Sequence, residues 1–273
     1  MLHNIDAKEY HCEYICRKPR LSRDYLLSFR EDSILMRGQR PPVLAEAVTA
    51  AQTASLQYLF SISDTSFYRS STPFSETKTL QYRSVQYLRR LTEPWLAFAS
   101  VTGYHLDTWY RRNQYCGGCA SILCHKDDER ALVCPKCGQI IYPHIAPAVI
   151  VGIVHGEKLL LTKYSAGFNQ SYALIAGFVE IGETLESAAQ REVYEEVGLR
   201  IKNIRYYDNQ PWGFSQSLLV GFFAELDGVP RITLETRELS EAVWVDRSDI
   251  PQSVSTLSLT SKMMEAFRLG QPV

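Results

Sequence analysis

The sequence predicts a mixed α+β fold in which two larger domains flank a small metal-binding ribbon. Three observations support this prediction. The 273 residues, 45% of them hydrophobic, are enough for more than one core. Two Cys-x2-Cys pairs lie near the middle of the chain. Strand and helix patterns then alternate towards the C-terminus, an order that fits an α/β/α sandwich. We expect an N-terminal α+β domain with a linking helix at 1–112, the ribbon at 113–143 and the sandwich at 144–273.

The N-terminal part contains recognisable elements but few residues with obvious chemistry. Apolar runs predict strands at 56–62 and 67–69, and a helical segment is expected at 43–54. Large apolar side chains at helical spacing predict an amphipathic helix over 93–113 that leads into the ribbon.

Four of the seven cysteines follow the pattern of a zinc ribbon. The two pairs are separated by 14 residues, one below the usual spacing of about 15–20. Glycine and proline in CGGC and CPKCG supply the tight turns that four thiolates need around tetrahedral zinc. A redox dithiol pair is the competing interpretation. We expect Cys124 to be a packed side chain, and Cys12 and Cys16 to be structural or free thiols. The predicted zinc ligands are Cys116, Cys119, Cys134 and Cys137.

The C-terminal part alternates between strand and helix patterns. Its predicted elements are strands on either side of the turn HGEK at 155–158, a strand at 174–179, a helix, strands near 203–208 and 216–226, a strand at 242–246 and a final helix at 258–269.

The richest chemistry lies in Gly177–Leu199, with the sequence GFVEIGETLESAAQREVYEEVGL. Three of its carboxylates, Glu192, Glu195 and Glu196, fall within about one helical turn and repel one another unless a cation or a basic partner lies among them. Carboxylates are hard ligands suited to Mg2+ or Mn2+. A solvated acidic helix face is the alternative. The opposite face is apolar, with Leu185, Ala189, Val193 and Val197 at four-residue spacing.

Every fixed position of the pattern G-x5-E-x7-R-E-U-x-E-E-x-G-U, where U is a bulky aliphatic residue, is present in this segment. The segment resembles the Nudix box, and the resemblance implies the α/β/α sandwich. We expect a bidentate pair between Arg191 and Glu183, close backbone approach at Gly177 and Gly182, and a helix C-cap at Gly198. The fixed positions are Gly177, Glu183, Arg191, Glu192, Val193, Glu195, Glu196, Gly198 and Leu199.

Three further features narrow the resemblance to the NADH pyrophosphatase family of Nudix hydrolases. The ribbon directly precedes the domain that contains the acidic segment, NQPWGFSQS follows that segment at 209–217, and Glu238 lies further on in RELSEAVWV. The family hallmark reads S-Q-P-W-P-F-P-x-S. Asn209, Gly213 and Ser215 depart from it, so the loop has lost two prolines and some rigidity.

This resemblance implies hydrolysis of the diphosphate bridge of NADH or NAD+ to NMN(H) and AMP, and action on RNA that carries a 5′-terminal NAD. It implies structural Zn2+ in the ribbon and catalytic Mg2+ or Mn2+, with either Glu195 or Glu196 accepting the proton of the attacking water. The implied catalytic residues are Glu183, Arg191, Glu192, Glu195 and Glu196, and the implied ligands of the catalytic metal are Glu192, Glu196, Glu238 and the Ala176 carbonyl.

The resemblance also implies a set of substrate-binding residues. The rings of Tyr142 and Phe178 are suited to stacking on a base. Core packing is the alternative for Phe178, Trp212 and Phe214, while ligand contact is favoured for Gln210 and Ser217. The full set is Glu129, Tyr142, Phe178, Gln210, Pro211, Trp212, Gly213, Phe214, Ser215, Gln216, Ser217 and Thr260.

Charge and hydropathy exclude several other classes of protein. The net charge of −1 argues against a general polyanion binder, although residues 1–112 carry 15 Lys and Arg against 11 Asp and Glu, a balance of +4. No apolar run approaches the ~20 residues that span a bilayer, and the N-terminus lacks an apolar signal core, so we expect a soluble, cytoplasmic protein without a membrane partner. The family implies a homodimer.

Two alternative functions remain open at this level. One is a Nudix hydrolase of ADP-ribose, diadenosine polyphosphates or other nucleoside diphosphate derivatives. The other is a nucleic-acid-binding zinc-ribbon protein with an inactive Nudix domain.

Overall fold

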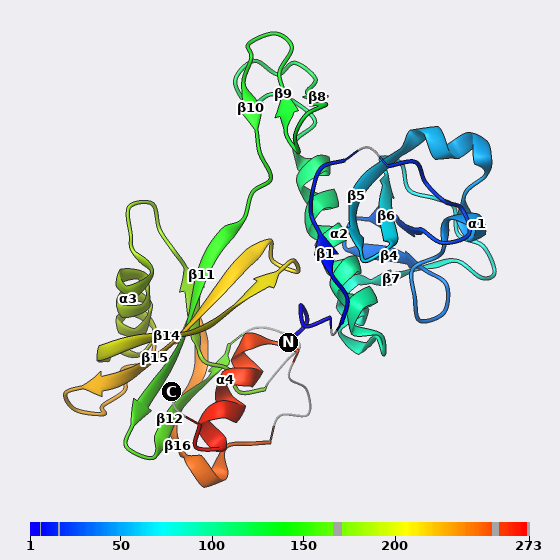
Figure 1. The fold of residues 1–273 in the computed structure, drawn as a ribbon. Coiled ribbons are helices and arrows are strands. Elements are labelled where there is room, and N and C mark those ends of the chain that lie inside the picture. The colour runs from blue at the N-terminus through cyan, green and yellow to red at the C-terminus, as the bar shows by residue number, and fades with distance from the viewer. Residues whose placement is uncertain (6, 16, 166–170, 253–256, 272–273) are drawn as a thin grey trace. The chain divides into compact units, whose positions relative to one another are not determined.

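The chain forms two compact units in the computed structural model (Figure 1). The N-terminal unit comprises 2–144 and 213–216, and the C-terminal unit comprises Met1, 145–212 and 217–273. The structure describes residues 1–5, 7–15, 17–165, 171–252 and 257–271. Within these ranges, no helix is both long enough and apolar enough to cross a membrane.

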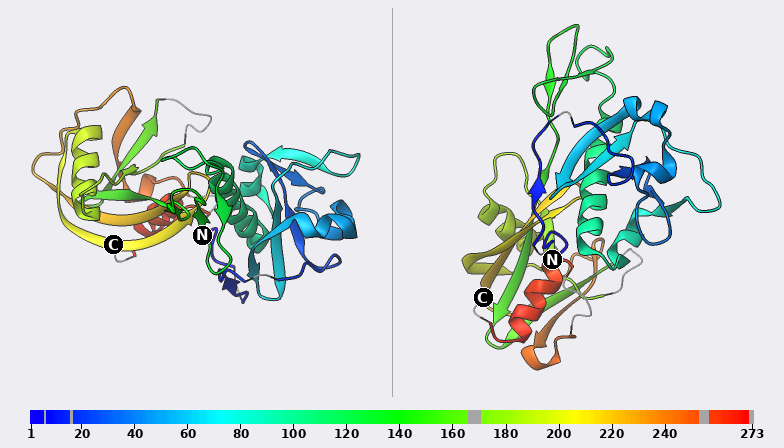
Figure 2. Two further views of the ribbon diagram at one scale, coloured as in Figure 1. Left: turned by 90° about the horizontal axis from the view of Figure 1, so that it is seen from above. Right: turned by 45° about the vertical axis from the view of Figure 1, so that its right-hand side comes forward.

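Apart from the ribbon, two small sheets and one long helix build the N-terminal unit (Figure 2). One sheet has the strand order β1-β5-β6-β2 and the other β3-β4-β7; β2 and β6 are parallel, and the other pairs are antiparallel. The strands are β1 (Tyr10–His11), β2 (Tyr25–Leu27), β3 (Phe29–Arg30), β4 (Ser33–Met36), β5 (Leu56–Ile62), β6 (Thr65–Ser70) and β7 (Gln81–Ser84); a 3-10 helix, η2 (Val85–Arg90), follows.

The linking helix was predicted correctly, whereas the helical segment at 43–54 was not. Helix α2 covers Pro94–Arg112, with proline in its first turn, where a missing N–H costs nothing. The earlier segment is broken into α1 (Leu44–Ala47) and the 3-10 helix η1 (Ala50–Ser55). The break falls at Val48-Thr49, where both residues are extended and Thr49 starts the second helix by pairing with Gln52. Two β-branched residues in a row favour that extended backbone.

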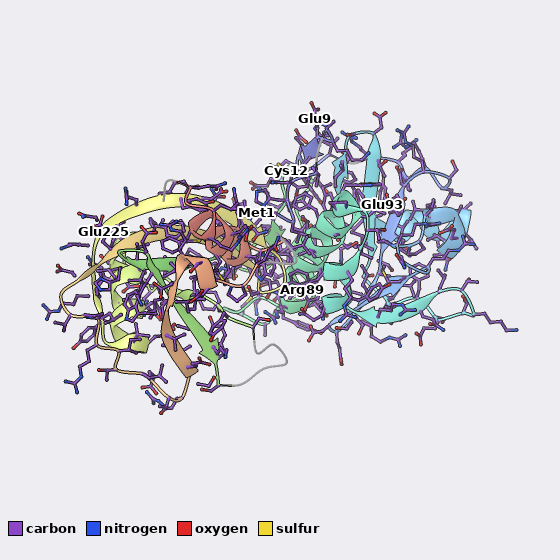
Figure 3. The ribbon with its side chains drawn as sticks, turned by 90° about the horizontal axis from the view of Figure 1, so that it is seen from below. Met1, Glu9, Cys12, Arg89, Glu93 and Glu225 are labelled. Atoms are coloured by element: carbon purple, nitrogen blue, oxygen red, sulfur yellow. The ribbon has the colours of Figure 1, made fainter. Side chains whose placement is uncertain are left out.

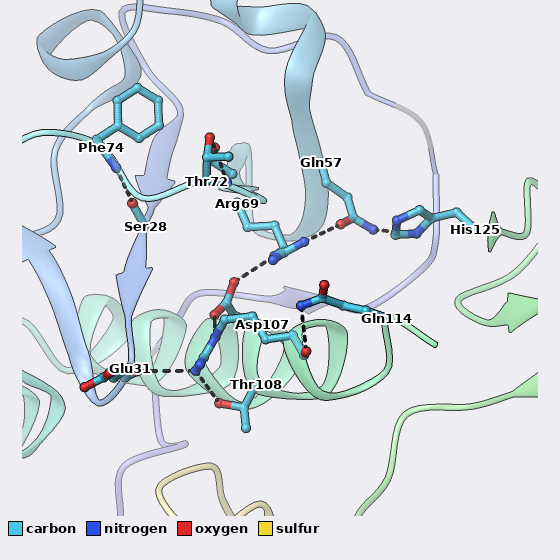
Figure 4. Close-up of polar contacts among 12 residues, drawn as sticks. Ser28, Glu31, Gln57, Arg69, Thr72, Phe74, Asp107, Thr108, Gln114 and His125 are labelled. Carbon is cyan, nitrogen blue, oxygen red and sulfur yellow. Dashed lines mark hydrogen bonds and ion pairs between the residues drawn. The ribbon is translucent and has the colours of Figure 1, made fainter. Parts of the chain in front are cut away.

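A buried ion pair joins α2 to the four-stranded sheet (Figure 4). Asp107 accepts from Arg69 Nε at 2.8 Å and from Arg111 Nε at 2.7 Å, and the Arg69 and Asp107 side chains are almost fully buried. Arg69 also donates to the Gln57 side chain at 3.1 Å, and Gln57 Nε2 lies 3.2 Å from His125 Nδ1 at the edge of the ribbon. The polar chain therefore ties the scaffold of this unit to its ribbon.

The ribbon is a three-stranded antiparallel sheet, β10-β9-β8, formed by Cys124–His125 (β8), Leu132–Val133 (β9) and Ile140–Ile141 (β10). The predicted packing of Cys124 is wrong, because its side chain is exposed on the edge strand. Cys12 is also exposed, on the N-terminal segment (Figure 3). Cys16 lies outside the described residues.

A six-stranded mixed sheet forms the centre of the C-terminal unit. Its strand order is β14-β15-β11-β12-β16, with β13 also paired to β11; β11 and β15 are parallel and the other pairs are antiparallel. The elements are β11 (Ala146–His155), β12 (Lys158–Tyr164), β13 (Ile175–Phe178), α3 (Leu185–Val197), β14 (Arg200–Trp212), β15 (Ser217–Asp227), β16 (Leu239–Asp246), the 3-10 helix η3 (Arg247–Asp249) and α4 (Leu259–Arg268).

The two helices cover opposite faces of this sheet (Figure 1). Alternate residues of β11 separate the two cores: Val149 and Val151 pack with Val193 of α3, whereas Ile150 packs with Met263 of α4. This arrangement is the expected α/β/α sandwich. Successive side chains of β11 point to opposite faces of the sheet, and each face therefore offers an apolar surface to one helix.

The segment NQPWGFSQS is a hairpin end and not a free loop. β14 continues to Trp212, which pairs with Ser217 at the start of β15, so that only residues 213–216 form the turn. Gln216 has a left-handed φ of 56° in that turn. Its departures from the family hallmark at Gly213 and Ser215 lie in the turn, while that at Asn209 lies in β14.

Candidate active site and zinc ribbon

The acidic segment folds as a strand, a loop and a helix. β13 ends at Phe178, and α3 begins at Leu185 after the Thr184 hydroxyl has accepted the N–H of Ser187 at 3.1 Å. Gly198 ends the helix in the left-handed conformation, with φ 66°, as the C-cap prediction requires. The helix therefore has a fixed start and end, and its carboxylates project from defined positions.

Arg191 connects the loop to the helix through hydrogen bonds to four residues. It binds Glu183 in bidentate fashion, Nε to Oε1 at 2.7 Å and Nη2 to Oε2 at 2.9 Å. It also donates to Glu192 at 2.8 Å, to Glu195 at 3.0 Å and to the Phe178 carbonyl at 2.9 Å. The hydrogen bond from Arg191 lowers the pKa of Glu183 to about 2. Glu183 is thus a permanent anion that positions the loop.

Gly177 is required by the close approach of Glu192. A Cβ built at position 177 would lie 1.9 Å from Glu192 Cδ, so no other residue fits without displacing the carboxylate. Burial raises the pKa of Glu192, and its bond to Arg191 opposes that effect. The first glycine of the motif therefore leaves the space that a carboxylate of the helix occupies.

The burial of Glu196 contradicts the alternative of a solvated acidic helix face. The residue is only 3% exposed, and its Oε2 has no hydrogen-bond partner. Burial raises its pKa to about 8, and the nearby charges of Glu192 and Glu238 act in the same direction. A buried oxygen without a partner is costly, and a bound cation would satisfy it. The donor set therefore fits a divalent metal.

Glu238 reaches this region from a different element. The Glu196 carbonyl accepts the N–H of Glu235 at 2.9 Å, and Ser165 N donates to the Glu238 carbonyl at 2.8 Å. Glu238 itself is exposed. Among the described residues, Glu192, Glu196 and Glu238 do not form a group as tight as the cysteine cluster described below.

Tyr164 is a neighbour that the sequence did not reveal. It lies at the end of β12, and the pKa of its phenol is raised to about 12, mainly by burial and further by Glu196, Glu238 and Glu192. A lone tyrosine at the end of an apolar strand is too common a pattern to indicate a site.

The four cysteines of the ribbon do form a tight group, with ligand atoms all within 4.8 Å of one another. The two halves repeat one geometry: Ala120 N donates to the Cys116 carbonyl at 2.8 Å, and Gly138 N to the Cys134 carbonyl at 2.9 Å. Ala120 and Gly138 both have left-handed φ, 58° and 75°. The second turn therefore uses the expected glycine, but the first uses an alanine after CGGC.

The predicted substrate residues fall into separate groups. Tyr142, 55% exposed, donates from its hydroxyl to Glu129 at 3.2 Å within the ribbon. Phe178 is 54% exposed, which excludes the core-packing alternative for it. Gln210 is fully buried, and its contacts are to backbone groups. Ser217 is 2% exposed.

The remaining members lie around the hairpin end and α4. Gly213 is buried. The Phe214 ring, which belongs to the N-terminal unit, lies 4.7 Å from the Arg89 guanidinium of the same unit. Trp212 is half-buried, and Pro211 and Ser215 are exposed. The Arg112 side chain donates to that of Gln216 at 3.2 Å. Thr260 is half-buried in the first turn of α4.

Family comparisons agree with this geometry. Residues 144–265 match the NUDIX domain, and residues 111–142 match the NADH pyrophosphatase zinc ribbon domain. The chain therefore matches a NUDIX domain with that zinc ribbon directly before it, and the resemblance seen in the sequence is confirmed.

More particularly, the chain is similar to the NAD-capped RNA hydrolase NudC. It is 42% identical to that protein from Escherichia coli O1:K1 and 43% identical to that from Shigella flexneri, in both cases over 149 residues. These matches cover 55% of this chain and span 58% of the length of the curated relatives. A crystal structure of a NUDIX hydrolase from Nitrosomonas europaea has a TM-score of 0.50 at 26% identity, and the match covers 58% of this chain and 94% of that one.

Proposed function

We propose that the protein hydrolyses the diphosphate bridge of NADH and NAD+, releasing NMN(H) and AMP, with Mg2+ or Mn2+ as cofactor. The observation that carries this proposal is the buried, unpartnered Oε2 of Glu196 beside the complete Arg191–Glu183 pair. An inactive domain would gain nothing from keeping a costly buried carboxylate. The homology to NAD-capped RNA hydrolases supports the choice of a dinucleotide substrate.

We assign the following roles to the residues of the site. Glu192, Glu196 and Glu238 would hold the cation, with the Ala176 carbonyl as a further ligand. When bound, the cation neutralises the bridge oxygens and makes the attacking water more acidic. Arg191 keeps Glu183 and Glu195 oriented through charge-assisted bonds. Glu195 or Glu196 accepts the water proton, and the exposed rings of Phe178 and Tyr142 offer faces for stacking on the bases.

RNA with a 5′-terminal NAD is the second substrate that we propose. The diphosphate bridge of such an RNA is the same chemical group, and its AMP half is the first nucleotide of the transcript. The net charge of +4 on residues 1–112 supports contact with the following phosphates, although weakly. Moderate salt should therefore slow NAD-RNA turnover more than NADH turnover.

Product analysis tests the proposal. Purified protein is incubated with NADH and Mg2+ or Mn2+, beside the variant Glu196→Gln and the control Glu186→Gln, which changes an exposed carboxylate on the same helix. We expect NMNH and AMP from the wild type and from Glu186→Gln only. Cleavage of ADP-ribose or diadenosine polyphosphates without NADH would move the function to another Nudix class. Salt-sensitive RNA binding without any turnover would support the inactive alternative.

A homodimer is also proposed, by analogy with the family. Light scattering after size exclusion at the concentration of the activity assay measures the mass. A value of twice the 31.1 kDa of the chain is expected, and a clean monomer that is active would refute it.

A further inference from the structure

We propose that Gln210 is a positioning residue, which holds the start of α4 against β14 and so determines where Thr260 lies, instead of contacting the substrate. This inference rests on the proposed function. The sequence had favoured ligand contact for this glutamine, because it belongs to the NQPWGFSQS segment. In the structure, its amide binds backbone groups at the start of α4.

The Gln210 amide is fully engaged by backbone groups of one segment. Its Nε2 donates to the Leu257 carbonyl at 2.8 Å, and its Oε1 accepts the N–H of Leu259 at 2.7 Å. The two bonds fix the orientation of the amide, since a flipped group would oppose donor to donor and acceptor to acceptor. With the residue 0% exposed, the side chain offers no surface to a ligand.

These two bonds complete the first turn of α4. Ser258 is the N-cap, and its hydroxyl accepts the N–H of Ser261 at 3.2 Å, three residues on. An N-cap side chain reaches the second or third N–H of the helix and leaves the first, that of Leu259, without a partner. Gln210 supplies that partner from 49 residues away. Loss of the side chain would therefore leave the buried N–H of Leu259 unsatisfied.

Packing makes the contact a rigid one. Leu259 is 0% exposed and belongs to the core that contains Met263 and Phe267. A Cβ at Gly221, on the neighbouring β15, would lie 3.2 Å from Leu259 Cδ2 and 2.8 Å from Met263 Sδ. The helix thus lies as close to the sheet as a glycine permits. Thr260 follows Leu259 directly, so its position is set by this contact.

A second attachment of the same helix provides the matched control. Lys262 Nζ lies 2.5 Å from Asp208 Oδ2, two residues before Gln210 on β14, but this ion pair is partly exposed. Partly exposed ion pairs contribute little to stability, because their charges are solvated when the pair is broken. Asp208→Asn therefore tests whether any weakening of the attachment of α4 has the same effect.

The test compares Gln210→Met, which keeps the shape and removes both bonds, with Gln210→Glu, which keeps the acceptor and removes the donor. Hydrogen exchange of the Leu259 amide is measured in the ligand-free protein, and KM and kcat are measured with NADH. For Gln210→Met we expect exchange at least about tenfold faster, as the loss of a buried hydrogen bond implies. We also expect KM for NADH to rise severalfold while kcat changes little. Gln210→Glu sets a buried carboxylate against the Leu257 carbonyl and should change both readouts at least as much as Gln210→Met, whereas Asp208→Asn should match the wild type.

The outcomes separate the possible roles. A raised KM with unchanged exchange would mean direct substrate contact and would overturn the proposal. Faster exchange with unchanged KM would reduce Gln210 to a structural residue and would overturn it too. If the wild-type protein does not turn over NADH, the proposed function fails, and the exchange data alone still decide whether the amide holds α4.

Discussion

The ribbon and the acidic site bring together their candidate metal ligands in different ways. In the ribbon, two backbone turns of the same geometry bring four sulfur atoms within 4.8 Å, and each turn is short in sequence. In the acidic site, the carboxylates come from α3 and from the segment before β16, Arg191 neutralises part of their charge, and Glu196 stays buried with a raised pKa. The contrast suggests a permanent structural metal in the ribbon and an exchangeable one at the acidic site.

The largest effect is expected from breaking the ribbon. Cys134→Ser removes a ligand whose backbone also forms the second turn, and structural zinc contributes about 10–16 kcal/mol in small zinc domains. We expect the zinc content to fall from one ion per chain to nearly none, measured by mass spectrometry of the metal. Cys124→Ser, at an exposed cysteine outside the cluster, should retain the ion. Equal zinc in both variants would contradict the proposed ligand set.

A smaller effect, on activity, is expected from the acidic site. Glu196→Gln keeps the shape but removes the charge that the cation needs. Mutation of a residue that only orients a metal ligand typically lowers metal affinity or activity by about 10–100-fold. Loss of a direct ligand should therefore lower kcat/KM by at least about 100-fold. Steady-state assays across a Mg2+ titration measure this, and zinc content should stay at the wild-type level. Activity that survives in Glu196→Gln would remove this residue from the site.

Arg191→Lys tests whether the charge or the geometry of the arginine holds the loop against α3. Lysine keeps the positive charge but cannot form the bidentate bond to Glu183 while also reaching Glu192 and Glu195. The lost charge-assisted bonds predict a decrease of about 1.5–3 kcal/mol in the free energy of unfolding. Denaturant unfolding measures it. A lysine variant as stable as the wild type would show that charge alone holds the loop.

The smallest effect concerns pH in the absence of divalent metal. The folded pKa of Glu196, about 8, lies above the ordinary value of 4.5, so its contribution to stability is fully present below 4.5. It is lost as the pH rises towards 8, because unfolding then lets the carboxyl ionise. In EDTA, Glu196→Gln should therefore gain stability relative to the wild type as the pH rises from 5 to 8, by a few degrees of Tm. Parallel curves for the two proteins would contradict the raised pKa.

Much of the architecture was predictable because its signals are local. The apolar run of β11, the helical spacing of α2 and the C-cap at Gly198 depend on near neighbours in the chain. The same holds for the bond between Arg191 and Glu183, which spans eight residues within one motif. Where local preferences conflicted, as at Val48-Thr49, the prediction of one helix was wrong.

By itself, the sequence determined the class of fold, the zinc ribbon and the acidic motif, because the spacing of cysteines, glutamates and glycines encodes backbone turns and helix faces directly. Only the tertiary structure decided which of these residues are buried. Glu196 looks equivalent to Glu195 in the motif, yet packing of α3 on the sheet leaves one 3% exposed and the other in solvent. Gln210 looks like a ligand residue, yet its amide completes a helix 49 residues away. Burial and long-range hydrogen bonds arise from packing between distant segments, and no local spacing records them.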